Sequence, residues 1–305
     1  MTANTPYLLE KLLGRAQLPA LPQSAIRLLE LSQDPDNGPH EFAVPIESDP
    51  GLTGQVLRFV NSSYFGFANE ISSIKLAISM VGIRTIKNFA MWSAVFSLMP
   101  NPKCGPFDLK SLWQDSLRRA LFSRIFGKIL GLANAEDLFA AALLQDMAVP
   151  LLAKELHKEY EELLDARMGG KVRLSTLEKE KFGWSHADAS ALMARNWSLP
   201  DQFVTLIELH TDLAGALENG SEGVRAVCLS AMLPTARDPS WNERSVFLGA
   251  FERLAPADAP PVAEVFASVD VAFGEFAPIL KLAIPAAALV DILAAEDAAV
   301  EDATV

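Results

Sequence analysis

The sequence predicts an all-α fold, and three observations support that class. Apolar residues recur at helical spacing through most of the 305 residues. The periodic segments are filled by Ala, Leu, Glu, Lys and Arg, which favour helices. No sustained alternation of apolar and polar residues marks a half-buried strand. Half of the residues are hydrophobic, enough to bury a large core.

The expected helices follow from caps and breaks along the chain. Asp49 can cap a helix whose first turn accepts Pro50. Leu52, Val56 and Val60 then share one helical face. The same reasoning predicts helices near 6–15, 22–33, 40–47, 50–60, 71–79, 82–98, 109–130, 136–146, 148–155, 157–168, 173–183, 186–196, 200–210, 222–233, 243–254, 260–273 and 275–294.

Proline and glycine divide the chain into larger units. Residues 100–106 contain three prolines and a glycine, so they form the strongest interior linker. Further breaks lie at 234–242 and 255–261. We predict a two-lobed bundle made of an N-terminal helical lobe (1–100), a second helical lobe (107–233), a C-terminal helical extension (234–295) and a flexible acidic tail (296–305).

Charge and cysteine content limit the classes of function. The formal net charge is −12, and an acidic surface opposes binding to the phosphate backbone of DNA. Cys104 and Cys228 lie far apart and form no CxxC pair, which favours a reducing compartment. No secretory signal or stretch long enough to span a bilayer is visible. We therefore expect a cytoplasmic protein with no membrane partner.

The segment Asp49–Gly66 is the most informative stretch. It reads Asp-Pro-Gly-Leu-Thr-Gly-Gln-Val-Leu-Arg-Phe-Val-Asn-Ser-Ser-Tyr-Phe-Gly. With Leu18-Pro19 and Leu21-Pro22 upstream, and Ile71-Ser72-Ser73-Ile74 downstream, it resembles an HDOD domain. That family is related to the HD metal-dependent phosphohydrolases and serves as a signalling output module. The resemblance covers roughly residues 12–215 and implies a role in bacterial regulation.

The resemblance also implies where a metal site would lie. HD enzymes hold a divalent ion with histidines and carboxylates from several helices. In the segment that matches the His-Asp pair, Gln145 replaces the histidine beside Asp146. Asp115, two residues after Trp113, stands where the first histidine is expected. A neutral amide oxygen is a poorer ligand than imidazole, so the match is degenerate.

Further along the chain, His186 and His210 match histidine positions of the enzymes, and Thr211 replaces the second of a pair. The final aspartate would fall near Cys228–Met232, where only Ala231 or a neighbour is available. Asp115, Asp146, His186 and His210 could hold a metal if they converged. The losses instead imply vestigial positions, no catalytic residue and no resident metal or other cofactor.

The N-terminal lobe offers two further candidates for binding. Tyr64, Phe65 and Phe67 form an aromatic cluster that packs in a core or, if exposed, makes a partner-binding patch. Arg84 and Lys87 can share one helical face and, with Arg58, could receive a phosphate or an acidic side chain. The alternative for these basic residues is an ordinary solvated face.

These observations favour a non-catalytic regulatory module. It would bind a signalling protein partner in trans, with a nucleotide second messenger as a further candidate ligand, and would not bind DNA. One alternative is a weak metal-dependent phosphohydrolase that acts on a nucleotide phosphodiester or monophosphate. Another is a nucleotide or nucleic-acid binding module that uses Arg58, Arg84 and Lys87, whose affinity would fall steeply with salt.

Overall fold

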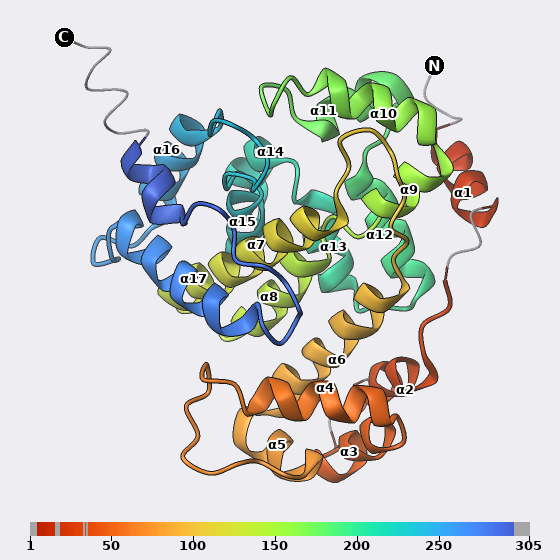
Figure 1. Ribbon diagram of the computed structural model, residues 1–305, viewed down its shortest axis with the longest axis vertical. Helices are drawn as coiled ribbons and strands as arrows, with labels where there is room; N and C mark the ends of the chain where they lie inside the picture. Colours follow the sequence, from red (N-terminus) through yellow and green to blue (C-terminus); the bar gives the residue numbers. More distant parts are fainter. Residues whose placement is uncertain (1–4, 16–18, 33, 35, 296–305) are drawn as a thin grey trace.

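The all-α prediction is confirmed. The structure is a computed structural model that describes residues 5–15, 19–32, 34 and 36–295, so Leu18 and the predicted tail lie outside the described residues. Within this part of the chain every regular element is a helix (Figure 1). The helices are α1 (Thr5–Arg15), α2 (Gln23–Leu31), α3 (Pro39–Glu47), α4 (Pro50–Val60), α5 (Ile74–Val81), α6 (Ile83–Leu98), α7 (Leu109–Ile129), α8 (Ala135–Leu144), α9 (Val149–Glu155), α10 (His157–Ala166), α11 (Leu174–Phe182), α12 (His186–Asn196), α13 (Asp201–Leu209), α14 (Leu213–Asn219), α15 (Glu222–Ser230), α16 (Arg244–Leu254) and α17 (Val262–Phe276).

The N-terminal lobe gathers α2 to α5 around the first part of α6 (Figure 1). Helix α4 begins where the sequence predicts it, because the Asp49 carboxylate accepts a hydrogen bond from the Leu52 amide at 3.0 Å. After α4, the Asn61 side chain accepts a bond from the Ile71 amide (2.7 Å) and donates to the Ile71 carbonyl (2.8 Å). Asn61 thus ties the end of α4 to the start of the α5 segment.

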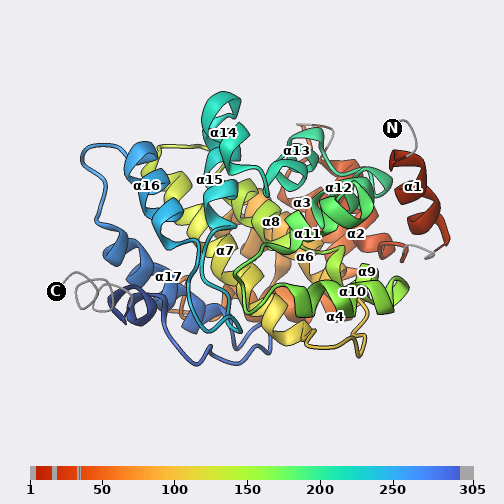
Figure 2. The same cartoon turned by 90° about the horizontal axis from the view of Figure 1, so that it is seen from above.

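The second lobe is built on the antiparallel pair α7 and α8. Figure 2 shows both helices in the middle of the molecule, with α16 and α17 on one side and α9 to α12 on the other. Helices α13 and α15 also pack on α8, and α15 packs on α7. Because α7 is covered on several sides, its arginines Arg118 and Arg124 are only 2% exposed. This central position brings side chains of α7 close to the ends of α8, α12 and α13.

The lobes are joined by polar contacts as well as by the chain. Asn88 on α6 donates to the Glu136 carbonyl at 3.0 Å, at the start of α8. Trp197, after α12, donates to the Pro19 carbonyl at 3.1 Å, so the Leu-Pro segment reaches the second lobe. Helix α1 also packs on α12. The exact domain boundaries stay a prediction.

Two local predictions were wrong. The predicted helix 275–294 is interrupted, since α17 ends at Phe276 and helical structure resumes only at residues 289–295. Pro278 and Pro285 lie in the gap, and proline cannot donate a helical hydrogen bond. Helix α14 was missed because it is short and contains Gly215, yet the Asp212 side chain caps it through the Gly215 amide (3.0 Å).

No helix among the described ranges is both long enough and apolar enough to cross a bilayer.

Candidate functional site

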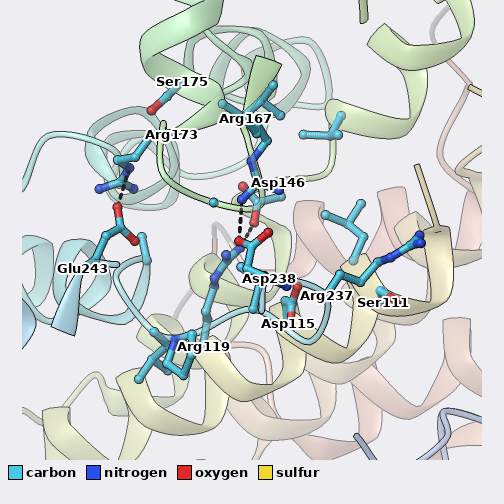
Figure 3. Close-up of a pocket in the computed structure, with 18 of the residues that line it drawn as sticks. Ser111, Asp115, Arg119, Asp146, Arg167, Arg173, Ser175, Arg237, Asp238 and Glu243 are labelled. Carbon is cyan, nitrogen blue, oxygen red and sulfur yellow. Dashed lines mark hydrogen bonds and ion pairs between the residues drawn. The ribbon is translucent and has the colours of Figure 1, made fainter. Parts of the chain in front are cut away.

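The ends of three helices and the middle of a fourth meet at Asp146. The α8 helix ends at Leu144, Gln145 is its C-cap, and Asp146 follows in a buried turn. His186 is the first residue of α12, held by a capping box between Ser185 and Asp188. His210 is the C-cap of α13. The fourth contribution is Arg119 from the middle of α7, which points at Asp146 (Figure 3).

The Asp146 carboxylate has a different partner at each oxygen. Its Oδ1 lies 3.2 Å from His186 Nε2 and 3.4 Å from His210 Nε2. Its Oδ2 accepts a hydrogen bond from Arg119 Nη1. The Asp146 and Arg119 side chains are 7% and 12% exposed, so this is a buried ion pair. One carboxylate therefore faces two imidazoles and one guanidinium.

The outer nitrogens of both histidines are also satisfied. His186 Nδ1 donates to Glu178 Oε2 at 2.6 Å, and its backbone amide donates to the same oxygen at 2.8 Å. The other oxygen of Glu178 accepts from the Tyr160 hydroxyl. His210 Nδ1 donates to the Ile207 carbonyl at 2.6 Å, because a carbonyl oxygen can only accept. Both rings are thus fixed with Nε2 directed at Asp146.

These contacts set the charges in the site. Burial opposes ionisation of Asp146, but Arg119 and the hydrogen bond from His186 outweigh it and hold its pKa well below the usual value. Burial also disfavours protonation of His186, yet Glu178 and Asp146 raise its pKa to about 10. Burial lowers the pKa of His210 in spite of Asp146. At neutral pH we therefore assign Asp146 as a carboxylate, His186 as an imidazolium and His210 as a neutral imidazole.

Asp146, His186 and His210 form a group that could hold a metal ion. One ligand atom from each residue lies within 4.8 Å of the others. Ligating histidines in metal sites usually donate their other ring nitrogen to a carboxylate or a carbonyl, as both do here. Of the four residues expected to converge, the structure brings these three together. The fourth, Asp115, lies on α7 and uses one oxygen to accept a hydrogen bond from the Ala236 amide at 2.7 Å.

Gln145 lies in the same place with no polar partner. Its side chain is fully buried, and neither the amide oxygen nor the amide nitrogen has a hydrogen-bond partner among the residues that the structure describes. Gln145, Asp115 and Ala231 all line a cavity of about 170 Å³ beside Asp146. The predicted vestigial positions therefore share one cavity.

Arg119 is the functional residue that sequence reasoning missed. It follows Asp115 by one helical turn, and residues four apart lie on the same face of a helix. That spacing was the available signal, because it places Arg119 on the α7 face that carries Asp115. Glu178 gave no comparable signal, since its role depends on α11 packing beside the start of α12.

The basic residues of the N-terminal lobe lie elsewhere. Arg84 donates to the Ala133 carbonyl at 3.1 Å and lies 3.7 Å from Asp137. Lys87 is partly buried, and desolvation lowers its pKa although Asp137 opposes that shift. Arg58 is exposed on α4. Arg84 and Lys87 thus face the start of α8, and the predicted anion site stays a prediction.

The aromatic cluster packs against the body of the protein. Tyr64 and Phe276 meet with ring centroids 4.6 Å apart, and Phe65 lies 5.0 Å from Phe59. Phe67 stacks on Phe65. The Arg124 guanidinium lies 4.6 Å from the centroid of Tyr64. All three aromatic residues are half-buried, which favours the packing interpretation, and their binding to a partner stays a prediction.

The sequence of this chain matches the model of one protein family. The model of the HDOD domain matches residues 18–213, well over half of the chain. The chain belongs to the HDOD domain family. An uncharacterized protein of Treponema pallidum is 22% identical over 216 residues, which are 70% of this chain but 42% of that relative. The chain thus spans less than half the length of that relative.

Solved structures share the fold of this HDOD protein. An HDOD domain protein of unknown function from Geobacter sulfurreducens is 22% identical with a TM-score of 0.64, over 99% of this chain and 96% of that one. A candidate metal-dependent phosphohydrolase from Shewanella amazonensis is 17% identical with a TM-score of 0.63, over 91% and 99%. A candidate signal transduction protein from Marinobacter aquaeolei is 20% identical with a TM-score of 0.64, over 92% and 63%. At these identities the likeness concerns the fold alone.

Proposed function

We propose that this HDOD protein is a non-catalytic regulatory module that acts by binding a protein partner or a signalling nucleotide. The observation that carries the proposal is the ion pair between Arg119 and Asp146. In an HD-type hydrolase, Asp146 would be a ligand of the catalytic ion. Here the guanidinium of Arg119 binds one oxygen of that carboxylate, so a side chain of the protein takes the place of the metal cation.

The residues present do not fit a catalytic divalent ion. The negative charges of Asp146 and Glu178 are matched by Arg119 and protonated His186. A divalent ion would add two positive charges beside a buried guanidinium, which is costly in a medium of low dielectric constant. Gln145 offers a neutral amide where an imidazole is expected, and Asp115 is hydrogen-bonded to the backbone of Ala236.

A regulatory role is in keeping with one structural relative, the candidate signal transduction protein of Marinobacter aquaeolei. Helices that surround a cavity can present a surface to another protein, and a change at the cavity can alter that surface. The net charge of −12 favours partners with basic segments over nucleic acids. We therefore expect the module to act through a signalling protein in trans.

The second candidate is a weak metal-dependent phosphohydrolase. It is favoured by one observation, the fixed outward hydrogen bonds that aim both Nε2 atoms at Asp146. If Arg119 swung away, these three residues could hold an ion that would activate water. The relative from Shewanella amazonensis is named as such an enzyme candidate.

Elemental analysis and turnover assays on the full chain separate the two functions. We expect substoichiometric zinc, manganese, iron and nickel, and no release of product from phosphodiester or nucleoside monophosphate substrates. The matched variant Asp146→Asn should give the same metal content and the same absence of turnover as the native chain. About one equivalent of metal, with turnover that Asp146→Asn abolishes, would overturn the regulatory proposal. If the regulatory proposal stands, affinity capture from the native cell followed by mass spectrometry would identify the protein partner.

A further inference from the structure

Arginines from three separate elements reach the cavity beside Asp146. Arg119 comes from the middle of α7, Arg167 is the C-cap of α10, and Arg173 is the N-cap of α11. Figure 3 shows Arg119 and Arg167 reaching toward Asp146 and Asp238 from opposite sides, with Arg173 at one edge. With Arg237 from the loop after α15, four arginines line this cavity, although the chain has a net charge of −12.

Two of these arginines hold a loop over the cavity. Residues 234–243, here called the roof loop, connect α15 to α16. Arg167 Nη2 lies 2.7 Å from Asp238 Oδ2, and Arg173 Nε lies 3.3 Å from Glu243 Oε1. The four side chains are between 13% and 27% exposed, so water can reach both pairs. The roof loop is therefore held by ion pairs that a competing anion can enter.

Two residues that line the cavity carry buried polar atoms that lack partners. Both amide atoms of fully buried Gln145 have none among the described residues, and the same is true of Arg167 Nε. An unsatisfied buried polar group costs about 1–3 kcal/mol, so native proteins seldom leave such groups unpaired. These atoms point to a ligand with hydrogen-bonding groups of its own.

We propose that the cavity binds a small molecule through its phosphate group, which replaces the carboxylates of Asp238 and Glu243 on Arg167 and Arg173. Phosphate matches the fork of a guanidinium and carries more negative charge than a carboxylate. The exchange leaves the charge of each arginine compensated. Gln145 then binds the polar part of the ligand that lies beyond the phosphate. This inference rests on the proposed regulatory function, because it gives the module a signal to read.

Release of the roof loop also changes the contacts that join this loop to α7 and to the linker. Ala236 in the loop donates to Asp115 on α7, and Arg237 donates to the Pro106 carbonyl at 2.6 Å. Pro106 belongs to the linker between the two lobes. Loss of the two ion pairs therefore loosens the roof loop, which connects the cavity to the linker. A partner that binds one arrangement of the loop would sense the ligand.

Isothermal titration of the full chain tests the proposal with two probes, inorganic phosphate and adenosine 5′-monophosphate, at constant ionic strength. The native loop competes with the probe for the two arginines, so only molecules with an open loop can bind the probe. The apparent affinity is therefore the intrinsic affinity multiplied by the fraction of open molecules. Asp238→Asn and Glu243→Gln remove the competing charge, and each should tighten binding about tenfold. Arg167→Gln should weaken it at least tenfold. Glu208→Gln, which frees the surface partner Arg195 in the same way, is the matched control and should change nothing.

The second measurement is trypsin cleavage after Arg237 in the roof loop, which phosphate should accelerate at least threefold in the native chain. If the ligand is a phosphate ester, adenosine monophosphate binds more tightly than phosphate, and Gln145→Met removes the difference. If it is free phosphate, the two probes bind equally. The proposal is overturned if neither probe binds any variant, or if Asp238→Asn and Arg167→Gln give the same affinity as Glu208→Gln. Metal content and turnover, which test the proposed function, are independent of these results.

Discussion

Replacing Arg119 with alanine should make the protein both less stable and responsive to zinc. The variant leaves Asp146, 7% exposed, without its guanidinium partner. Removing one partner of a buried ion pair typically costs about 3–5 kcal/mol, because the remaining charge is uncompensated. The same change opens the Asp-His-His group to a cation. At a hundred times its dissociation constant, a bound ion would restore about 2.7 kcal/mol.

Urea unfolding, followed by circular dichroism with and without zinc, measures both effects. Arg119→Lys is the first control, since it keeps a positive charge and should lose less than half as much stability. The double variant Arg119→Ala with Asp146→Asn is the second, since it lacks the carboxylate and should not respond to zinc. The reasoning is refuted if Arg119→Ala unfolds at the native urea concentration, or if zinc stabilises the native chain and the double variant equally.

Three other substitutions test separate parts of the structure. Gln145→Met removes two unsatisfied amide atoms at similar volume, so the free energy of unfolding should stay level or rise by about 1 kcal/mol in urea titrations; a loss above about 2 kcal/mol would contradict this assignment. Burial raises the pKa of Asp115 from 3.8 to about 6, so its contribution to stability is complete below about pH 4 and is lost as the pH rises through 6. Asp115→Asn can still accept the hydrogen bond from Ala236, so its free energy of unfolding should rise by up to about 3 kcal/mol relative to the native chain between pH 4 and pH 7. A difference between the two proteins that does not depend on pH would contradict the raised pKa of Asp115. Asn61→Ala removes the bonds to Ile71 and should lower stability by about 2 kcal/mol, whereas Ser62→Ala, with one bond to a carbonyl, should cost about 1 kcal/mol or less.

Local signals in the sequence accounted for the helices because helix formation depends on neighbours in the chain. At the start of α4 the Asp49 carboxylate accepts from the Leu52 amide, and at the start of α12 the Asp188 carboxylate accepts from the Ser185 amide, each three residues away. The apolar face of α4 was predicted for the same reason. Where prolines interrupt the apolar pattern, as at Pro278 and Pro285, the extended helix was wrong because alanine-rich composition hid the break.

The candidate site was only partly predictable. Asp146, His186 and His210 were chosen because they match the positions of a family signature, and the structure brings them together. Gln145 lies beside them in the lining of the cavity. Asp115 instead accepts a bond from the roof loop, which no pattern in the sequence places over α7.

The sequence by itself determined an all-helical chain of the HDOD family with a glutamine, Gln145, beside Asp146, because side-chain identity and helical periodicity are properties of the chain. Only the tertiary structure decided which groups compensate the buried charges. Arg119 reaches Asp146 across 27 residues of chain, and Arg167 reaches Asp238 across 71. Residues so far apart in the sequence meet only through the packing of the helices. A buried charge must be paired, and the packing decides which partner lies within hydrogen-bonding distance.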